Sequence, residues 1–243
     1  MLRAEKKEEE IYQIRSIFRK GLHFLPASGD LFLAAVKDDP AWSDQDLAAL
    51  LSHRELTGRR GGAAARAWLL GRLAAKAAAG RRWGASPGEM EIRPGQGGRP
   101  WCFLALTPAG FISLSHTRGA AVAVAASRPV GLDLEPWSRP LSDRAWSWSF
   151  TPQERLLAEG SGLFPARLAM WCAKEAAAKS WGLGLLRHLS QVRVAGTDWP
   201  GGRLTVTWQG RKKETSEVCL SRWEAYLVAL AQPETEGEAV HDV

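Results

Sequence analysis

The chain has 243 residues, of which 45% are hydrophobic and 24% are charged, and its formal net charge is +6. This length suits one globular domain or two small ones with a sizeable core. The longest apolar runs fall far short of the roughly 20 residues that cross a bilayer, which argues against a membrane segment. The first 20 residues carry charges of both signs around no apolar signal core, so we expect no secretion signal.

Cysteine usage indicates the compartment. The three cysteines, Cys102, Cys172 and Cys219, are an odd number and have no metal-ligand spacing. This pattern suits a reducing environment and argues against a disulfide framework, so we expect a cytoplasmic protein.

The excess positive charge lies in the first half of the chain. Residues 1–126 contain 18 Lys and Arg against 12 Asp and Glu, a net charge of 18 − 12 = +6, whereas the remaining residues contain 14 of each. Such a bias suits an anionic partner, whether a nucleotide, a nucleic acid or an acidic protein. A solvated basic surface without a partner explains the charge equally well.

Two helices are predicted in the first half. Ser43 is a plausible N-cap for a helix from about Asp44 to Glu55. The Ala-rich and Leu-rich run at 61–80, bounded by glycines, predicts a long helix. Arg72 and Lys76 lie four residues apart on one face of it, where like charges are unfavourable unless an anion lies between them. The run at 86–100 is typical of a loop.

The following segments predict strands and then two further helical regions. Strands are expected at 111–116, 120–126 and 130–135, the last ended by Pro136. Thr151, Pro152 and Glu154 form a capping box inside a helix–break–helix run over 142–160. A second long helix is predicted over 165–184, followed by antiparallel strands between residues 190 and 232.

Each half therefore offers a long Ala-rich helix followed by strands. This order predicts an α+β fold of two similar subdomains, although no close sequence repeat is present. The predicted subdomains are 1–126, which carries the excess positive charge, and 127–232. The remaining residues, 233–243, form an acidic tail that we expect to be flexible.

Two acidic residues stand out in "VGLDLEPW". In a strand Asp133 and Glu135 point to the same face, roughly 7 Å apart, so they repel each other and call for a positive charge between them. A second acidic position follows in "WCAKEAAAK", where Glu175 and Lys179 share a helix face and Lys174 points about 100° away from Glu175. Taken alone, this second motif is most simply an exposed ion pair that contributes ~0.3–0.5 kcal/mol.

A third motif, "SLSH", lies at the end of a predicted strand. A lone His116 beside Ser115 is most often a hydrogen-bonded turn residue, and no third group for a catalytic triad is visible in the sequence.

Six segments in a fixed order carry a family resemblance. They are "GRLAAKAA", "GRP" at 98–100, "SLSH", "VGLDLE", "FTPQE" at 150–154 and "WCAKEAAAKSWG". Over about residues 66–184 the chain resembles the phosphopantetheinyl transferases of the Sfp type, and the "GLDLE" and "WCAKEAAAK" pair is the most specific part. Ser113, Thr117 and Trp181 depart from the usual family pattern, which affects substrate preference and not the reaction class.

The resemblance implies a pseudo-twofold fold and a specific reaction. That reaction is the Mg²⁺-dependent transfer of 4′-phosphopantetheine from coenzyme A to a serine of an apo acyl or peptidyl carrier protein, which releases adenosine 3′,5′-bisphosphate. Asp133, Glu135 and Glu175 would supply hard oxygen ligands to Mg²⁺, which would relieve their repulsion. Glu175 or a metal-bound water would act as the base, and Lys179 would contact the pyrophosphate or balance the metal ligands.

The remaining cofactor contacts are also implied by the resemblance. Asp133, Lys174 and Lys179 would contact coenzyme A from the second half. The basic first half would hold its 3′-phosphate and adenine through the residues Arg72, Arg99, Ser115 and His116. Arg66, Lys76 and Arg118 are weaker candidates that are more simply surface charges.

Several alternatives and partners follow from these patterns. The aromatic run Trp146, Trp148 and Phe150 belongs either to the core or to a carrier-docking surface. A catalytically inactive module that binds coenzyme A or a nucleotide is the alternative function. We expect no nucleic-acid partner, because the basic half lacks aromatic residues interleaved with its Arg and Lys at a recognised spacing. We also expect no membrane partner, and we expect a monomer because a chain with two family-like halves more often acts alone.

Overall fold

The computed structural model describes residues 22–25, 30–57, 64–95, 98–162, 164–184, 188, 191–210 and 213–234. The chain divides into two compact units, Met1–Arg128 and Pro129–Val243, which are described separately. Among the described residues, no helix is both long and apolar enough to cross a membrane. Most of the predicted tail and the predicted start of the first long helix lie outside the described residues.

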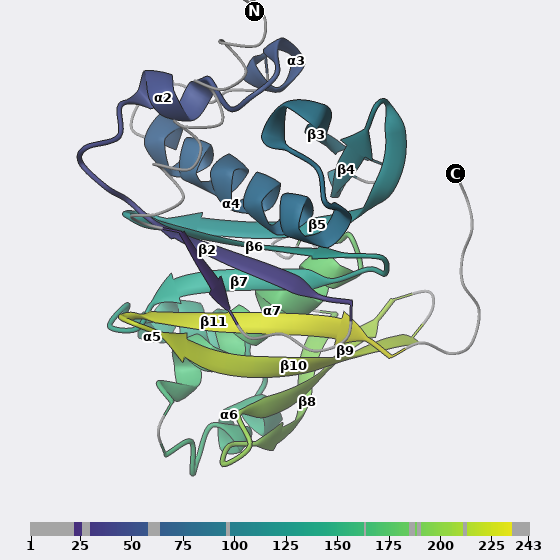
Figure 1. Ribbon diagram of the computed structural model, residues 1–243. Helices are drawn as coiled ribbons and strands as arrows, with labels where there is room; N and C mark the ends of the chain where they lie inside the picture. Colours follow the sequence, from purple (N-terminus) through teal and green to yellow (C-terminus); the bar gives the residue numbers. More distant parts are fainter. Residues whose placement is uncertain are drawn as a thin grey trace, which may run out of the picture. The chain divides into compact units, whose positions relative to one another are not determined.

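The first unit is a six-stranded antiparallel sheet with one long helix on it (Figure 1). The sheet order is β1-β2-β6-β5-β4-β3, and helix α4, Ala65–Trp83, packs against β2, β5 and β6. The strands are β1 Leu22–Leu25, β2 Phe32–Lys37, β3 Met90–Pro94, β4 Pro100–Leu104, β5 Thr107–Thr117 and β6 Ala120–Ala126. Alanines line both α4 and β6, so the helix and the sheet meet through small side chains and their backbones approach closely.

Three sequence predictions for this unit were wrong in detail. The helix expected at 44–55 is two short helices, α2 Asp44–Ala48 and α3 His53–Leu56, because Ser52 makes a second capping box with Glu55. Helix α4 continues past Gly80 to Trp83 and is capped by Gly84, whose φ of +68° gives the left-handed conformation of a C-cap. The expected loop at 86–100 contains the short helix η2, Pro87–Glu89, and strand β3.

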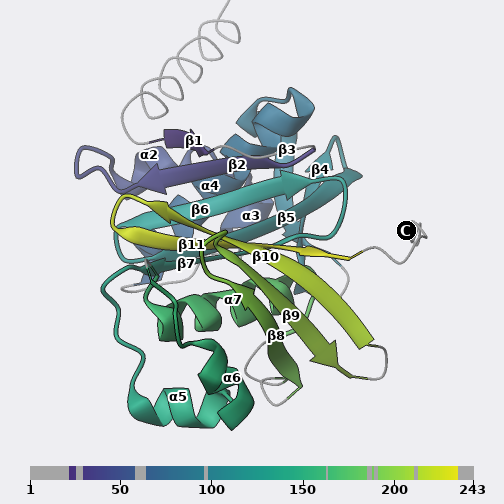
Figure 2. The same ribbon diagram turned by 90° about the horizontal axis from the view of Figure 1, so that it is seen from below.

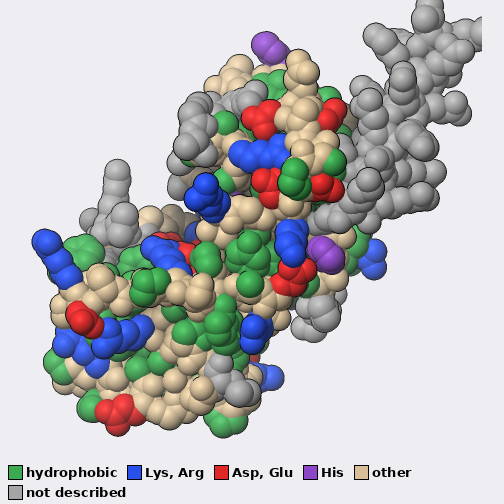
Figure 3. All heavy atoms as spheres, turned by 90° about the vertical axis from the view of Figure 1, so that its left-hand side faces the viewer, with side chains coloured by type: hydrophobic (Ala, Val, Ile, Leu, Met, Phe, Trp, Pro, Cys, Tyr) green, Lys and Arg blue, Asp and Glu red, His purple; other side chains and the backbone are tan. Residues whose placement is uncertain are grey.

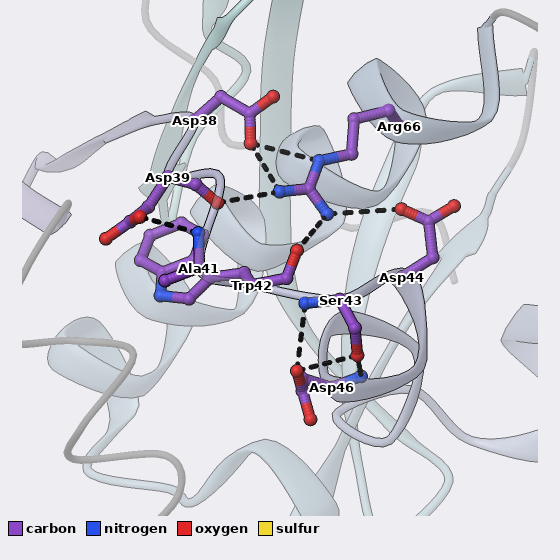
Figure 4. A network of polar contacts seen from close by, with 8 residues as sticks. All are labelled: Asp38, Asp39, Ala41, Trp42, Ser43, Asp44, Asp46 and Arg66. Carbon is purple, nitrogen blue, oxygen red and sulfur yellow. Dashed lines mark hydrogen bonds and ion pairs between the residues drawn. The ribbon is translucent and has the colours of Figure 1, made fainter.

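Arg66 ties the start of α4 to the turn after β2 (Figure 4). Its guanidinium donates to the carboxylates of Asp38 and Asp44 and to the backbone carbonyls of Asp39 and Trp42. These contacts occupy the N–H donors of the guanidinium, so Arg66 has a structural role and is no longer a candidate for binding phosphate.

The second unit is a five-stranded antiparallel sheet with helix α7, Ala166–Ser180, packed against it (Figure 2). The sheet order is β7-β11-β10-β9-β8. Its other elements are β7 Gly131–Pro136, α5 Asp143–Ser149, α6 Pro152–Leu157, β8 Val192–Asp198, β9 Arg203–Gln209, β10 Lys213–Trp223 and β11 Tyr226–Pro233. The helix–break–helix run, the capping box at Thr151 and the antiparallel strands after residue 190 were all predicted from sequence.

A buried ion pair of the same design occurs in both units. In the first, Lys76 of α4 pairs with Glu55 at 2.9 Å, and Glu55 also accepts the Ile92 amide of β3. In the second, Lys174 of α7 pairs with the capping-box residue Glu154 at 2.7 Å. Glu154 likewise accepts a strand amide, from Val194 of β8. The α+β class is confirmed, and the two units share a buried ion pair that the sequence did not reveal.

Candidate active site

Strand β7 and helix α7 approach each other unusually closely at Gly131. A Cβ atom added there would lie 1.8 Å from the carbonyl oxygen of Ala176 and 2.6 Å from the amide nitrogen of Ser180. Only glycine allows this contact, because any larger residue would collide with the helix backbone. Asp133 and Glu135 lie further along the same face of β7, so Gly131 brings their carboxylates next to α7.

Asp133 is held by a cation from α7. Its buried carboxylate accepts from Lys179 Nζ at 2.8 Å, and the same ammonium donates to the Leu132 carbonyl at 3.0 Å. The neighbouring Cys172 thiol is affected by the same carboxylate, since burial raises the pKa of the thiol and Asp133 raises it further. Burial by itself would lower the pKa of Lys179, but the carboxylates of Asp133 and Glu175 outweigh it and the pKa is raised. Lys179 is therefore charged at neutral pH.

Glu135 is held by a second cation, which comes from the turn after β7. Arg139 donates to Glu135 Oε1 and forms an ion pair with it. Burial raises the pKa of Glu135, and the Arg139 hydrogen bond opposes that rise while the charge of Asp133 adds to it.

Glu175 completes the group from helix α7. Burial raises its pKa, and the negative charges of Asp133 and Glu135 raise it further, whereas Lys179 and Arg139 lower it. The three predicted acids therefore act on one another electrostatically, together with two cations that lie among them. This arrangement provides the positive charge that two acids on one strand face required.

The chemistry of these donors fits a hard divalent cation. Carboxylate oxygens are the ligands that Mg²⁺ prefers in proteins. In the part of the chain that the structure describes, no three Asp, Glu, His or Cys side chains are grouped so that they could hold one metal ion as they stand. Lys179 and Arg139 now contact two of the three carboxylates, so metal binding would require at least one of these cations to move.

Lys174 does not lie where the sequence analysis expected it. Its side chain is 0% exposed, and its ammonium contacts Glu154 and the Ser149 carbonyl in the core of the second unit. Burial lowers the pKa of Lys174 to about 8, although the pairing with Glu154 offsets part of the effect. The contact predicted between Lys174 and coenzyme A is withdrawn, because the fully buried ammonium cannot be reached by a ligand.

The anion that Arg72 and Lys76 of helix α4 face is a side chain of the protein itself, Glu55. Arg72 and Lys76 share a helix face, and the charge of Glu55 acts on both. Lys76 is buried at 1% exposure, so its reading as a surface charge was wrong. Burial lowers the pKa of Arg72, whose guanidinium donates to the Ile92 carbonyl at 2.5 Å and lies over the Trp68 ring.

Ser115 and His116 are neighbours on β5, so their side chains point to opposite faces of the sheet. His116 faces α4, because a Cβ atom added at Gly71 of that helix would lie 3.2 Å from its ring. Arg99 is half-buried and immediately precedes β4, and its carbonyl accepts the Gly95 amide. A single phosphate would therefore not be contacted by Ser115 and His116 from one side of the sheet.

The aromatic run and the surface charges also differ from expectation. Trp146, Trp148 and Phe150 lie on and just after helix α5, and two of them belong to the core while Trp148 is 69% exposed. On the face drawn in Figure 3, the basic side chains stand in several separate groups with acidic residues among them.

The sequence did not indicate three contacts in and near the site. Arg139, Cys172 and Glu154 contact Glu135, Asp133 and Lys174 respectively. The capping box was the only signal that could have pointed to Glu154, since a Glu at this position already turns towards the helix start.

The comparison with protein families matches this part of the chain. Residues 129–231 match the family model of the 4′-phosphopantetheinyl transferase superfamily (ACPS), a segment that contains β7, α7 and the three carboxylates but covers less than half of the chain. Such transferases use coenzyme A and act on carrier proteins, so the match indicates phosphopantetheine transfer in general. A search of the curated proteins finds no match to the chain.

Proposed function

We propose that the protein is an Sfp-type 4′-phosphopantetheinyl transferase that converts an apo acyl or peptidyl carrier protein to its holo form. The observation that carries this proposal is the group of three mutually interacting carboxylates on β7 and α7, inside the segment that matches the superfamily. Buried like charges are costly, so a fold keeps them together only where a cation compensates them.

The three carboxylates have distinct roles in this proposal. Asp133, Glu135 and Glu175 would hold Mg²⁺, which when bound would neutralise the charge that develops on the 5′-phosphate of the departing adenosine 3′,5′-bisphosphate as the pyrophosphate linkage of coenzyme A breaks. Glu175 also accepts the proton of the incoming serine hydroxyl. Lys179, charged and fixed by Asp133, binds a pyrophosphate oxygen and orients it, since phosphoryl transfer depends mainly on positioning and charge stabilisation.

The first unit supplies the proposed contacts to the 3′-phosphoadenosine end of coenzyme A. Arg72 is half-buried and rests on Trp68, which presents a guanidinium in a fixed orientation. Arg99 and Ser115 are the further donors, and His116 supports the α4 face of β5. The net charge of +6 in residues 1–126 favours an anionic ligand over the whole unit.

An intact-mass assay tests this function. Purified protein, Mg²⁺ and coenzyme A should add about 340 Da, the mass of one phosphopantetheine, to an apo carrier protein. The variants Asp133→Asn and Glu175→Gln should slow transfer by at least about a hundredfold, because changing even the outer hydrogen-bond partners of metal ligands costs about 10–100-fold. Glu159→Gln removes an exposed glutamate of the same unit and serves as the control.

The outcomes separate the proposal from its main alternative. If coenzyme A binds but is not consumed with any carrier in a panel of fatty-acid, polyketide and nonribosomal-peptide carriers, the chain is an inactive binding module. If transfer proceeds and both carboxylate variants match the control, the transferase stands and the assignment of its residues is wrong.

A further inference from the structure

Arg139 occupies a defined position beside the three carboxylates. It lies in the turn that follows β7, where its amide donates to the Pro136 carbonyl at 2.9 Å. This turn folds the chain back, so that the guanidinium reaches Glu135 four residues earlier. No motif in the sequence pointed to this residue.

The charge of Arg139 acts on the whole acidic group. Arg139 forms an ion pair with Glu135, and its charge also acts on Glu175. Three carboxylates, Arg139 and Lys179 carry a summed charge of −3 + 2 = −1 when all are ionised. Without Arg139 the sum is −2, which attracts a divalent cation more strongly.

Of the two cations, Arg139 is the one that can leave. Its side chain is 45% exposed, whereas the Glu135 side chain that it contacts is 13% exposed. Lys179 is held by two contacts, one to a carboxylate and one to a backbone carbonyl, and it is the more enclosed of the two. A guanidinium that leaves Glu135 enters water directly, so its release costs little beyond the loss of one partly exposed ion pair.

We infer that Arg139 is an internal counter-ion of Glu135 that gives way when a divalent cation binds, and that the released guanidinium then contacts the pyrophosphate of coenzyme A. This inference rests on the proposed function, because it requires that Glu135 serves as a metal ligand. It assigns to Arg139 two opposite effects, one that weakens metal binding and one that strengthens binding of the anionic substrate.

The opposite effects give a test that a structural role would not reproduce. In Arg139→Gln, the dissociation constant for Mn²⁺ alone should fall about two- to fivefold, as expected for the loss of one partly exposed competing ion pair. In the presence of saturating Mg²⁺, the dissociation constant for coenzyme A should rise, because a charge-assisted contact to phosphate is lost. Arg144→Gln, which removes an exposed arginine of the same unit, is the matched control.

Both constants can be measured without turnover, the first by electron paramagnetic resonance of free Mn²⁺ and the second by calorimetry. Tighter Mn²⁺ binding together with weaker coenzyme A binding supports the inference. Unchanged Mn²⁺ binding, or weaker binding of both ligands, overturns it and leaves the transferase proposal intact if the intact-mass assay is positive. If neither the unmodified chain nor the variants bind Mn²⁺, the metal assignment fails, and this inference fails with it.

Discussion

Replacing Lys174 with methionine should strongly destabilise the second unit, because the change leaves the buried carboxylate of Glu154 without its counter-ion. The Lys174 and Glu154 side chains are 0% and 3% exposed, and their charged atoms lie 2.7 Å apart. Methionine has a flexible, unbranched side chain that fills the space of the lysine side chain without carrying a charge. Glu154 would still accept the amides of Thr151 and Val194, so its charge would stay fixed in the core.

The expected size of the effect follows from this burial. Breaking a buried ion pair by removing one partner costs about 3–5 kcal/mol. With a denaturant slope of about 2 kcal/mol/M for urea, the midpoint of unfolding should fall by roughly 2 M. The hydrogen bond from Lys174 to the Ser149 carbonyl is lost as well, which places the estimate towards the upper end.

Urea titrations followed by tryptophan fluorescence and circular dichroism would measure this loss. The double variant Lys174→Met with Glu154→Gln removes the stranded charge and should recover a large part of the stability. Lys76→Met is the matched variant in the first unit, because Lys76 forms the corresponding pair with Glu55.

One result would refute this reasoning. If Lys174→Met unfolds at the same urea concentration as the unmodified chain but loses phosphopantetheine transfer, the lysine acts on a ligand and not on the core. Recovery of transfer in the double variant would instead show that the lysine acts through stability.

Two further predictions concern packing and pH. Gly131→Ala should lower the free energy of unfolding by at least about 1–3 kcal/mol in the same urea titration, because its methyl group would overlap the Ala176 carbonyl. Gly184→Ala is the control and should be nearly neutral, because a Cβ atom there meets nothing within 4 Å. Burial lowers the pKa of Lys76 below its ordinary value of 10.5, so the unfolded chain binds more protons in the window just below pH 10.5. The free energy of unfolding should therefore rise with pH across that window relative to Lys76→Met, and a parallel pH dependence of the two proteins would contradict the assignment.

The elements that the sequence predicted are those with strong local signals. The capping box at Thr151 and the glycine at position 182 mark helix ends wherever the chain folds, because both act through neighbouring backbone groups. Strand β2 has the sequence "FLAAVK", which shows no alternation of apolar and polar residues, and β3 has "MEIRP", which alternates over only four residues and ends in a proline. Their pairing is decided by partners far along the chain, so single-sequence patterns do not reveal it.

The site was predictable only in part for a similar reason. The two-residue period of a strand places Asp133 and Glu135 on one face without any tertiary information. Nothing local distinguishes Lys174, which points into the core, from Glu175, which points towards the carboxylates. That choice depends on where Glu154 lies in the fold, 20 residues earlier in the chain. Arg139 reaches Glu135 through a turn whose geometry the sequence does not specify.

The shared construction of the two units indicates which residues the fold itself does not need. In each unit the long helix packs on a strand that pairs with the last strand of the following meander, β2 with β6 in the first and β7 with β11 in the second. The register aligns the ends of these strands, since Lys37 pairs with the first residue of β6 and Pro136 with the first residue of β11. By this register Asp133 corresponds to Ala34, and Glu135 to Val36.

The helices correspond in the same way, with Lys174 equivalent to Lys76 and therefore Glu175 equivalent to Ala77. In the first unit Ala34, Val36 and Ala77 are all buried in one apolar cluster. The same scaffold thus forms with small apolar side chains at all three positions, which is the less costly solution for packing. The carboxylates in the second unit replace a stable apolar contact with mutual repulsion, so packing does not account for them. Lys179 and Arg139 offset part of that repulsion, and the proposed metal site would give the charged group a role. The comparison between the units therefore supports that proposal through an argument that does not use the family match.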